Sequence, residues 1–151
     1  MVQTYEPWWP LAEQVEKRFL SAELVVDFPD AVVRLDQGYR EGVAIGPSVV
    51  IEFPNVAATA LHEEYVHPWN ANDDEPVWPK QAHVAIVQDS VWLQSFSLSQ
   101  LAMYEAPVHY RIVTEFPIID IICTGAPLAR YQPAPPHQED SVANSSSKRT
   151  R

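Results

Sequence analysis

The stretch that decides the fold is "VHYRIVTEFPIIDIICT", Val108–Thr124. Its first part alternates between two faces, one made of Val108, Tyr110, Ile112 and Thr114 and the other of His109, Arg111, Val113 and Glu115. Such alternation is typical of a strand in an antiparallel sheet with one buried and one solvated face. Pro117 separates this strand, Val108–Phe116, from a nearly continuous apolar strand, Ile118–Thr124. The stretch therefore predicts two neighbouring strands of one sheet.

Five further strands are predicted from short runs rich in β-branched and apolar residues, bounded by proline, glycine or aspartate. They are Ala22–Phe28, Ala31–Leu35, Ser48–Phe53, Ala82–Gln88 and Val91–Phe96. The run "DQG", Asp36–Gly38, has the chemistry of a turn. Asp89 and Ser90 are interpreted as a tight hairpin between the last two of these strands.

Two helices are predicted. The first spans Pro10–Leu20, where apolar residues recur at the helical spacing i, i+4 and i+8. The second spans Leu98–Glu105, because Ser97 followed by Gln100 forms a capping-box pattern. Many strands with two helices predict an α+β fold, with a mostly antiparallel sheet of about five to seven strands backed by the N-terminal helix and the second short helix.

The chain divides into three zones. Residues 1–9 form an arm rich in tryptophan and proline, residues 10–131 form a single α+β domain, and residues 132–151 form a polar tail. A chain of 151 residues is long enough to bury a sizeable core without disulfides or metals. The tail has almost nothing apolar to bury, so we expect it to be disordered.

Composition excludes several classes of protein. The formal net charge of −10 repels phosphate backbones, so nucleic-acid binding is not expected. No apolar run approaches the ~20 residues that span a bilayer, so no membrane partner is expected either. The N-terminus "MVQTYEPWWP" lacks the pattern of a signal peptide, which predicts a cytoplasmic or virion location without signal-peptide secretion.

The segment "HEEYVH", His62–His67, is the strongest candidate for a metal site. Its two histidines are five positions apart, whereas a zinc-peptidase helix needs them four apart. On a strand, an odd spacing would place them on opposite faces. The chain also lacks a glycine-rich phosphate loop and a G-x-S-x-G serine motif. We therefore expect no catalytic residue, no metal and no cofactor.

The tryptophans are the most unusual feature of the sequence. Trp8, Trp9, Trp69 and Trp78 all lie beside prolines or in proline-flanked segments. Packing against the chain's own body and packing at an interface fit these positions equally well. Tryptophan is enriched in protein interfaces, and proline reduces the entropy lost on ordering such segments. The four residues are therefore candidate interface residues.

Together these features predict a non-catalytic structural or interaction protein, a subunit of a larger assembly whose partners are other protein subunits, identical or different. The predicted order of helix, strands, helix and strands is loosely like that of small phage tail-completion or neck proteins. The specific expectation is a bacteriophage virion tail or neck component. One alternative is a small ligand-binding or metal-dependent α+β enzyme, with a site where His62, Glu64, His83 and His109 converge. A second alternative is an acidic immunity or inhibitor protein that masks a basic partner.

Overall fold

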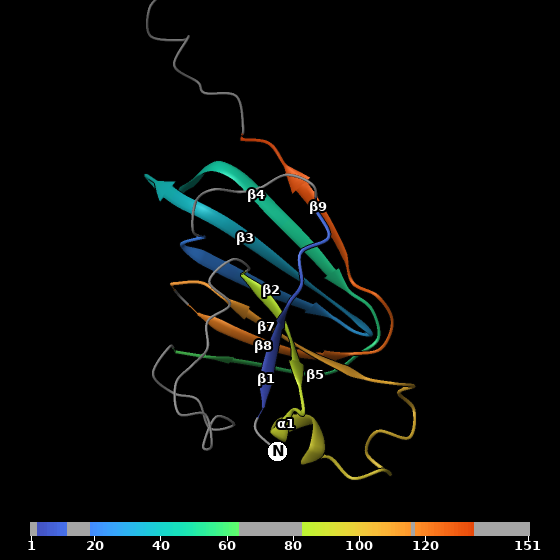
Figure 1. Cartoon of the computed structure of the whole chain (residues 1–151). Coiled ribbons are helices and arrows are strands. Elements are labelled where there is room, and N and C mark those ends of the chain that lie inside the picture. Colours follow the sequence, from blue (N-terminus) through green and yellow to red (C-terminus); the bar gives the residue numbers. More distant parts are fainter. Residues whose placement is uncertain (1–2, 12–18, 64–82, 116, 135–151) are drawn as a thin grey trace, which may run out of the picture.

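The fold is a β-sandwich. The computed structural model describes residues 3–11, 19–63, 83–115 and 117–134, which form two antiparallel sheets that lie face to face (Figure 1). The first sheet has the order β1-β6-β7-β8-β5, with β1 at Thr4–Pro7, β6 at Val84–Gln88, β7 at Val108–Val113, β8 at Ile118–Cys123 and β5 at Val56–His62. The second has the order β2-β3-β4-β9, with β2 at Ser21–Asp27, β3 at Asp30–Arg40, β4 at Val43–Phe53 and β9 at Leu128–Gln132.

The core lies between the two sheets and follows from the period of two along each strand. In the first sheet it includes Val84, Tyr110, Ile112, Ile119, Ile121 and Cys123; in the second it includes Ala31, Val33, Leu35, Val49, Ile51 and Phe53. The register places Ile112 beside Ile119 and Val33 beside Ile51, so apolar side chains also meet within each sheet. The expected apolar face of Val108–Phe116 is thereby confirmed. The strand itself ends at Val113.

The α+β expectation is wrong, because the described residues are nearly all β. Within them the one α-helix is α1, Val91–Gln94, and it lies where a strand over Val91–Phe96 was predicted. Ser90 explains the difference: its Oγ accepts a hydrogen bond of 3.0 Å from the backbone N–H of Leu93 and so caps the helix. The predicted hairpin at Asp89 and Ser90 is a helix start.

Neither of the two predicted helices is formed by residues that the structure describes. Residues 12–18 of the proposed Pro10–Leu20 helix lie outside the described residues, and the described residues at its two ends are not helical. In the proposed Leu98–Glu105 helix, the capping box forms. The N–H of Ser97 donates to Gln100 Oε1 at 2.7 Å, and the N–H of Gln100 donates to Ser97 Oγ at 3.2 Å. The segment nevertheless stays in turns, because a short helix needs tertiary packing and Leu98 is 93% exposed.

Three strands were missed and one turn was misplaced. The missed strands are β1, β5 and β9. The predicted turn at Asp36–Gly38 is a shift of register within β3, so β3 and β4 extend well beyond it into a long hairpin. The hairpin turns at Glu41 and Gly42, both with positive φ (53° and 79°), as tight two-residue hairpin turns require.

The N-terminal segment contributes to the first sheet. Part of residues 1–9, the arm rich in tryptophan and proline, forms the strand β1 and pairs with β6. Trp8 and Trp9 are half-buried and pack against the core: Trp8 meets Tyr110 edge-on at 5.7 Å between ring centroids, and Trp9 meets Phe19 at 6.1 Å. Residues 135–151, most of the predicted tail, lie outside the described residues.

The Trp8 contact predicts a loss of stability in the isolated protein. Trp8→Ala removes an edge-to-face contact with Tyr110 and exposes part of the core, so we expect a loss of about 1–3 kcal/mol in the free energy of unfolding. Denaturant unfolding of the purified chain measures this loss. Leu128→Ala, at a residue 65% exposed, is the control and should stay within about 0.5 kcal/mol of wild type. An unchanged Trp8→Ala protein would show that the ring does not hold the sandwich together.

Candidate functional site

The candidate site is a buried polar cluster on the face of the first sheet that turns away from the core. Arg111 of β7 and Asp120 of β8 stand directly opposite each other in the register. Both are buried, with relative exposures of 4% and 0%. His109, two positions before Arg111, is buried on the same face. The sequence predicted that this face is solvated, and that prediction is wrong.

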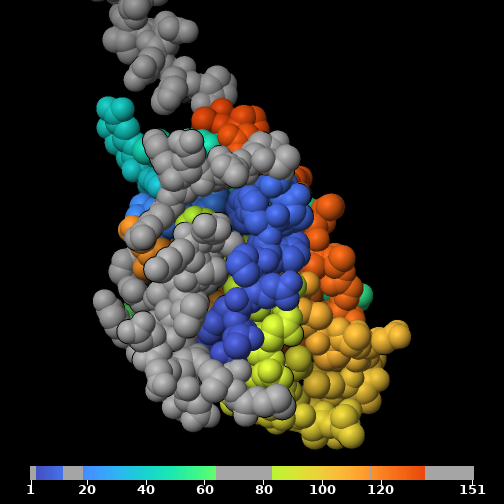
Figure 2. Space-filling view, viewed as in Figure 1, coloured from blue at the N-terminus to red at the C-terminus, as the bar shows by residue number. Residues whose placement is uncertain are grey.

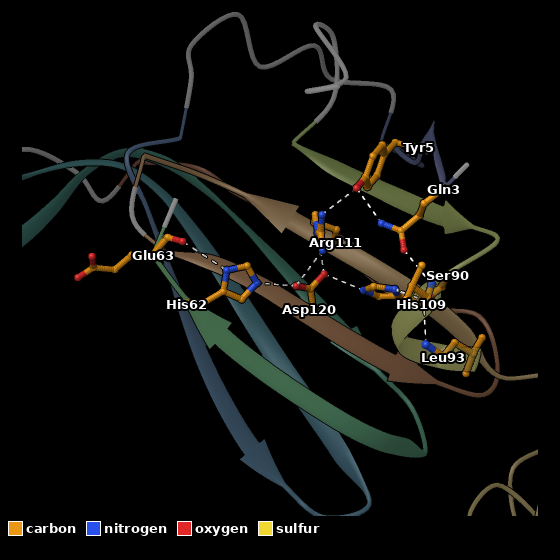
Figure 3. A network of polar contacts seen from close by, with 10 residues as sticks. Gln3, Tyr5, His62, Glu63, Ser90, Leu93, His109, Arg111 and Asp120 are labelled. Atoms are coloured by element: carbon orange, nitrogen blue, oxygen red, sulfur yellow. Dashed lines mark hydrogen bonds and ion pairs between the residues drawn. The ribbon is translucent and has the colours of Figure 1, made fainter. Parts of the chain in front are cut away.

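Asp120 is the centre of the cluster, and three side chains converge on its carboxylate (Figure 3). Its Oδ1 accepts hydrogen bonds from His109 Nε2 at 2.7 Å and from Arg111 Nε at 2.8 Å. Its Oδ2 accepts one from His62 Nε2 at 2.7 Å, with Arg111 Nη2 at 3.4 Å. Carboxylate oxygens only accept, so both imidazoles carry a proton on Nε2.

The cluster extends from Arg111 to the N-terminal strand. Arg111 Nη1 donates to the Tyr5 hydroxyl at 3.0 Å, and Gln3 Nε2 donates to the same oxygen at 2.9 Å. Gln3 Oε1 in turn accepts the first N–H of α1, that of Val91, at 3.0 Å. These bonds connect β1 and α1 to the middle of the sheet.

Ser90 joins the cluster from the start of α1. Its Oγ lies 2.7 Å from His109 Nδ1. Because Nε2 of this neutral ring holds the proton, Nδ1 accepts from the Ser90 hydroxyl, while the same oxygen accepts from the N–H of Leu93. The Trp92 ring meets the His109 ring edge-on at 5.2 Å between centroids. Both nitrogens of His109 and the cap of α1 are thereby satisfied.

The electrostatics of the cluster follow from burial and pairing. Burial alone would raise the pKa of Asp120, but hydrogen bonds from His109 and His62 and the charge of Arg111 outweigh it and hold that pKa well below its ordinary value. Burial lowers the pKa of His109 despite its bond to Asp120. The cluster thus contains one carboxylate and one guanidinium that neutralise each other, beside a neutral His109.

Hydrogen bonds connect Ser90 to His109 and His109 to Asp120, as they connect the serine, histidine and aspartate of the catalytic triad in a serine hydrolase. Burial argues against that chemistry, since Ser90 is 3% exposed and its oxygen caps a helix. No group of three metal-ligating side chains among the described residues is arranged to hold an ion. In the described residues the arrangement binds five elements together: β1, β5, β7, β8 and α1.

The residues predicted as sites do not lie together, and some of them are outside the described residues. Trp8 and Trp9 pack on the core, and Trp69 and Trp78 lie outside the described residues, so an interface at these four residues stays a prediction. Of the four residues proposed to converge in the enzymatic alternative, His62 and His109 both reach Asp120. His83 instead meets the Phe19 ring at 4.8 Å, and Glu64 lies outside the described residues.

Sequence reasoning missed Asp120, Arg111 and Ser90 as members of one cluster. The available signal was Asp120 itself, a lone carboxylate inside the apolar run "IIDIIC". A charge in a fully buried strand needs a partner with opposite charge. The nearest place for that partner is the paired position on the neighbouring antiparallel strand, and Arg111 occupies this position.

The lowered pKa of His109 predicts a stability that falls below neutral pH. The unfolded chain has the ordinary His pKa of about 6.5, so below that pH it binds a proton that the folded chain excludes. The stability contributed by neutral His109 is therefore complete above about pH 6.5 and is lost as the pH falls toward the folded pKa, by at most about 1.4 kcal/mol per pH unit. Unfolding of wild type and His109→Gln at pH 7 and pH 5 measures it, and the variant should lose less. An equal loss in both proteins would contradict the neutral state of His109.

No helix in the described part of the chain is long and apolar enough to cross a membrane. No family model, no curated protein and no solved structure matches the chain.

Proposed function

We propose that the protein is a non-catalytic structural subunit that assembles with further copies of itself. The observation that carries this proposal is an end of the sandwich where large apolar side chains are exposed on an ordered surface. Phe28, Leu98 and Met103 are 72%, 93% and 92% exposed. We call this surface, made of Phe28–Asp30 and residues 95–107, the loop end.

Hydrogen bonds hold the parts of the loop end together. The carbonyl oxygen of Pro29 accepts the N–H of Val56, and the carbonyl oxygen of Val56 accepts the Tyr104 hydroxyl at 3.5 Å. Thr124 Oγ1 donates to the carbonyl oxygen of Glu105. The segment of residues 95–107 is thus tied to β5 and to the end of β8, and it presents Leu98 and Met103 on a fixed support.

The chemistry of this surface supports association with protein. Apolar side chains gathered on an ordered surface mark interaction sites, since leaving them in water is unfavourable. The stretch "SVWLQSFSLSQLAMY", Ser90–Tyr104, contains no charged residue, although the chain carries a formal net charge of −10. A second acidic copy meets no repulsion from this stretch itself, and the exposed carboxylates of the loop end, Asp30 and Glu105, lie outside it. A basic partner would instead favour the acidic remainder of the surface.

The buried cluster also supports a structural role. Ser90, His109 and Asp120 use their polar atoms on one another and on the backbone of α1, and all three are buried. A catalytic group must reach its substrate. Surface contacts are therefore the better candidate for function.

Within this class, a bacteriophage virion tail or neck component is the specific proposal. The predicted order of helix and strands no longer supports it, because the described fold is a β-sandwich. What supports it is a compact β body with ordered apolar projections, since a subunit surrounded by identical neighbours needs surfaces of this kind.

Light scattering coupled to size exclusion tests the assembly. Purified wild type should show a mass above the 17.1 kDa monomer that rises with concentration. Leu98→Ser with Met103→Ser should return the mass to 17.1 kDa. Its unfolding midpoint should equal that of wild type diluted until it is monomeric, because both side chains are almost fully exposed. Leu61→Ser, at a 58% exposed residue on β5, is the matched control and should assemble as wild type does. A wild-type monomer at every concentration would refute the proposal.

A second candidate function, a serine hydrolase, is favoured by the bonds Ser90 Oγ–His109 Nδ1 and His109 Nε2–Asp120 Oδ1, both 2.7 Å. A fluorophosphonate probe reacts with activated serines and distinguishes the two candidates. We expect no labelling of the folded protein, because Ser90 is buried and caps α1. Labelling of wild type that disappears in Ser90→Ala would establish the hydrolase and remove the non-catalytic assignment.

A further inference from the structure

A second projection lies at the opposite end of the sandwich. It is the end of the β3–β4 hairpin, Tyr39–Ile45, which we call the hairpin tip. Its large apolar residues Tyr39, Val43 and Ile45 are 47%, 61% and 42% exposed. In Figure 2 the hairpin tip projects at the upper left, while residues 95–107 form the lower right corner. The two surfaces therefore lie at opposite ends of the molecule.

The hairpin tip is an ordered element. Its strands stay paired up to Arg40 and Val43, with Glu41 and Gly42 in the turn. At its base the Tyr39 hydroxyl donates to Asp36 Oδ2 at 2.8 Å, and Asp36 is buried. The exposed apolar residues are thus presented on a fixed support at this end as well.

Charge distinguishes the two ends. Three of the four arginines in the described residues have a carboxylate partner in the same chain: Arg34 with Asp36, Arg111 with Asp120 and Arg130 with Glu52. Arg40, exposed on the hairpin tip, is the fourth and has no such ion pair within the described residues. The loop end carries the exposed carboxylates of Asp30 and Glu105, with Asp27 beside them, and no lysine or arginine. The hairpin tip therefore offers the cation of Arg40, with the carboxylate of Glu41 beside it, and apolar side chains to a loop end whose charged residues are all carboxylates.

We infer that copies of this chain associate head to tail, with the hairpin tip of one copy packed on the loop end of the next. Arg40 faces the carboxylates of the loop end, while Val43 and Ile45 cover its exposed apolar residues. This inference rests on the proposed function and adds the polarity of the contact. A two-fold contact between identical loop ends would bring like carboxylates together and leave the hairpin tip uncovered.

The consequence is an assembly that repeats. Each copy contributes its hairpin tip to one neighbour and its loop end to the other, so the contact joins two different surfaces and is heterologous. Such contacts close into a ring when the rotation between neighbours divides a full turn, and otherwise continue as a filament. The assembly therefore grows beyond a dimer.

Two variants, each blocked at one end, test this polarity. The loop variant is Leu98→Glu with Met103→Glu, and the hairpin variant is Arg40→Glu with Val43→Thr. All four side chains are exposed, so both variants should keep the unfolding midpoint of wild type diluted until it is monomeric. Each variant alone should have the monomer mass of 17.1 kDa in light scattering. An equimolar mixture should form a 1:1 dimer and nothing larger, because one intact hairpin tip meets one intact loop end.

The outcomes separate this inference from the proposed function. A hairpin variant that assembles as wild type does would overturn the head-to-tail contact and leave self-assembly in place. A mixture that stays monomeric would overturn it as well. A wild-type monomer would refute self-assembly itself. If the hairpin variant unfolds, Arg40→Glu alone replaces it, and the same mixture with the loop variant should then show the 1:1 dimer.

Discussion

The buried ion pair between Arg111 and Asp120 is the interaction on which the first sheet depends. A carboxylate with 0% exposure is strongly unfavourable without a compensating charge, and the guanidinium across the strand supplies it through Nε at 2.8 Å. Removing one partner from such a pair typically costs about 3–5 kcal/mol, because the other charge stays buried alone. The remaining hydrogen bonds of the carboxylate and the guanidinium fix which elements surround the pair. His62 brings β5, Tyr5 brings β1, and His109 brings the capped start of α1.

This constraint also supports the proposed structural role. The cluster uses its polar groups to hold elements that are far apart in the sequence, from Tyr5 to Asp120. Its interior offers packing and charge balance, whereas the ends of the sandwich offer exposed apolar residues. Leu98 and Met103 contribute little to the core, yet hydrogen bonds at Tyr104 and Glu105 hold their segment in place. Ordering a segment costs conformational entropy, and the proposed interaction site on that segment accounts for this cost, which burial in the core does not.

The sequence correctly predicts those features of the structure that depend on a single local property of the chain. The alternation of Tyr110 and Ile112 identified the core face of β7, because burial on that face depends only on the period of two. It failed where tertiary contacts decide: Val91–Phe96 has the composition of a strand, but the Ser90 cap and its bond to His109 make it begin a helix. β5, "VAATALH", was missed because alanine is a poor strand former, and its pairing with β8 overrides that preference. The assignment of each strand to one of the two sheets depends on which strands pair with each other, and the pattern of residues within a single strand does not specify its partners.

The uneven charge of the chain bears on how copies meet. A formal net charge of −10 makes most approaches between copies repulsive, and this repulsion acts at distances up to the Debye length of about 8–10 Å. An approach becomes favourable where one surface lacks charge or carries the opposite sign. Ser90–Tyr104 lacks charge, and Arg40 is the one described arginine that has no ion pair with a carboxylate within the described residues. These two features lie at opposite ends of the body, so this distribution of charge favours the proposed head-to-tail contact over side-by-side contacts. In the proposed assembly, the acidic surface supplies orientation, while the apolar residues of the two ends supply the affinity.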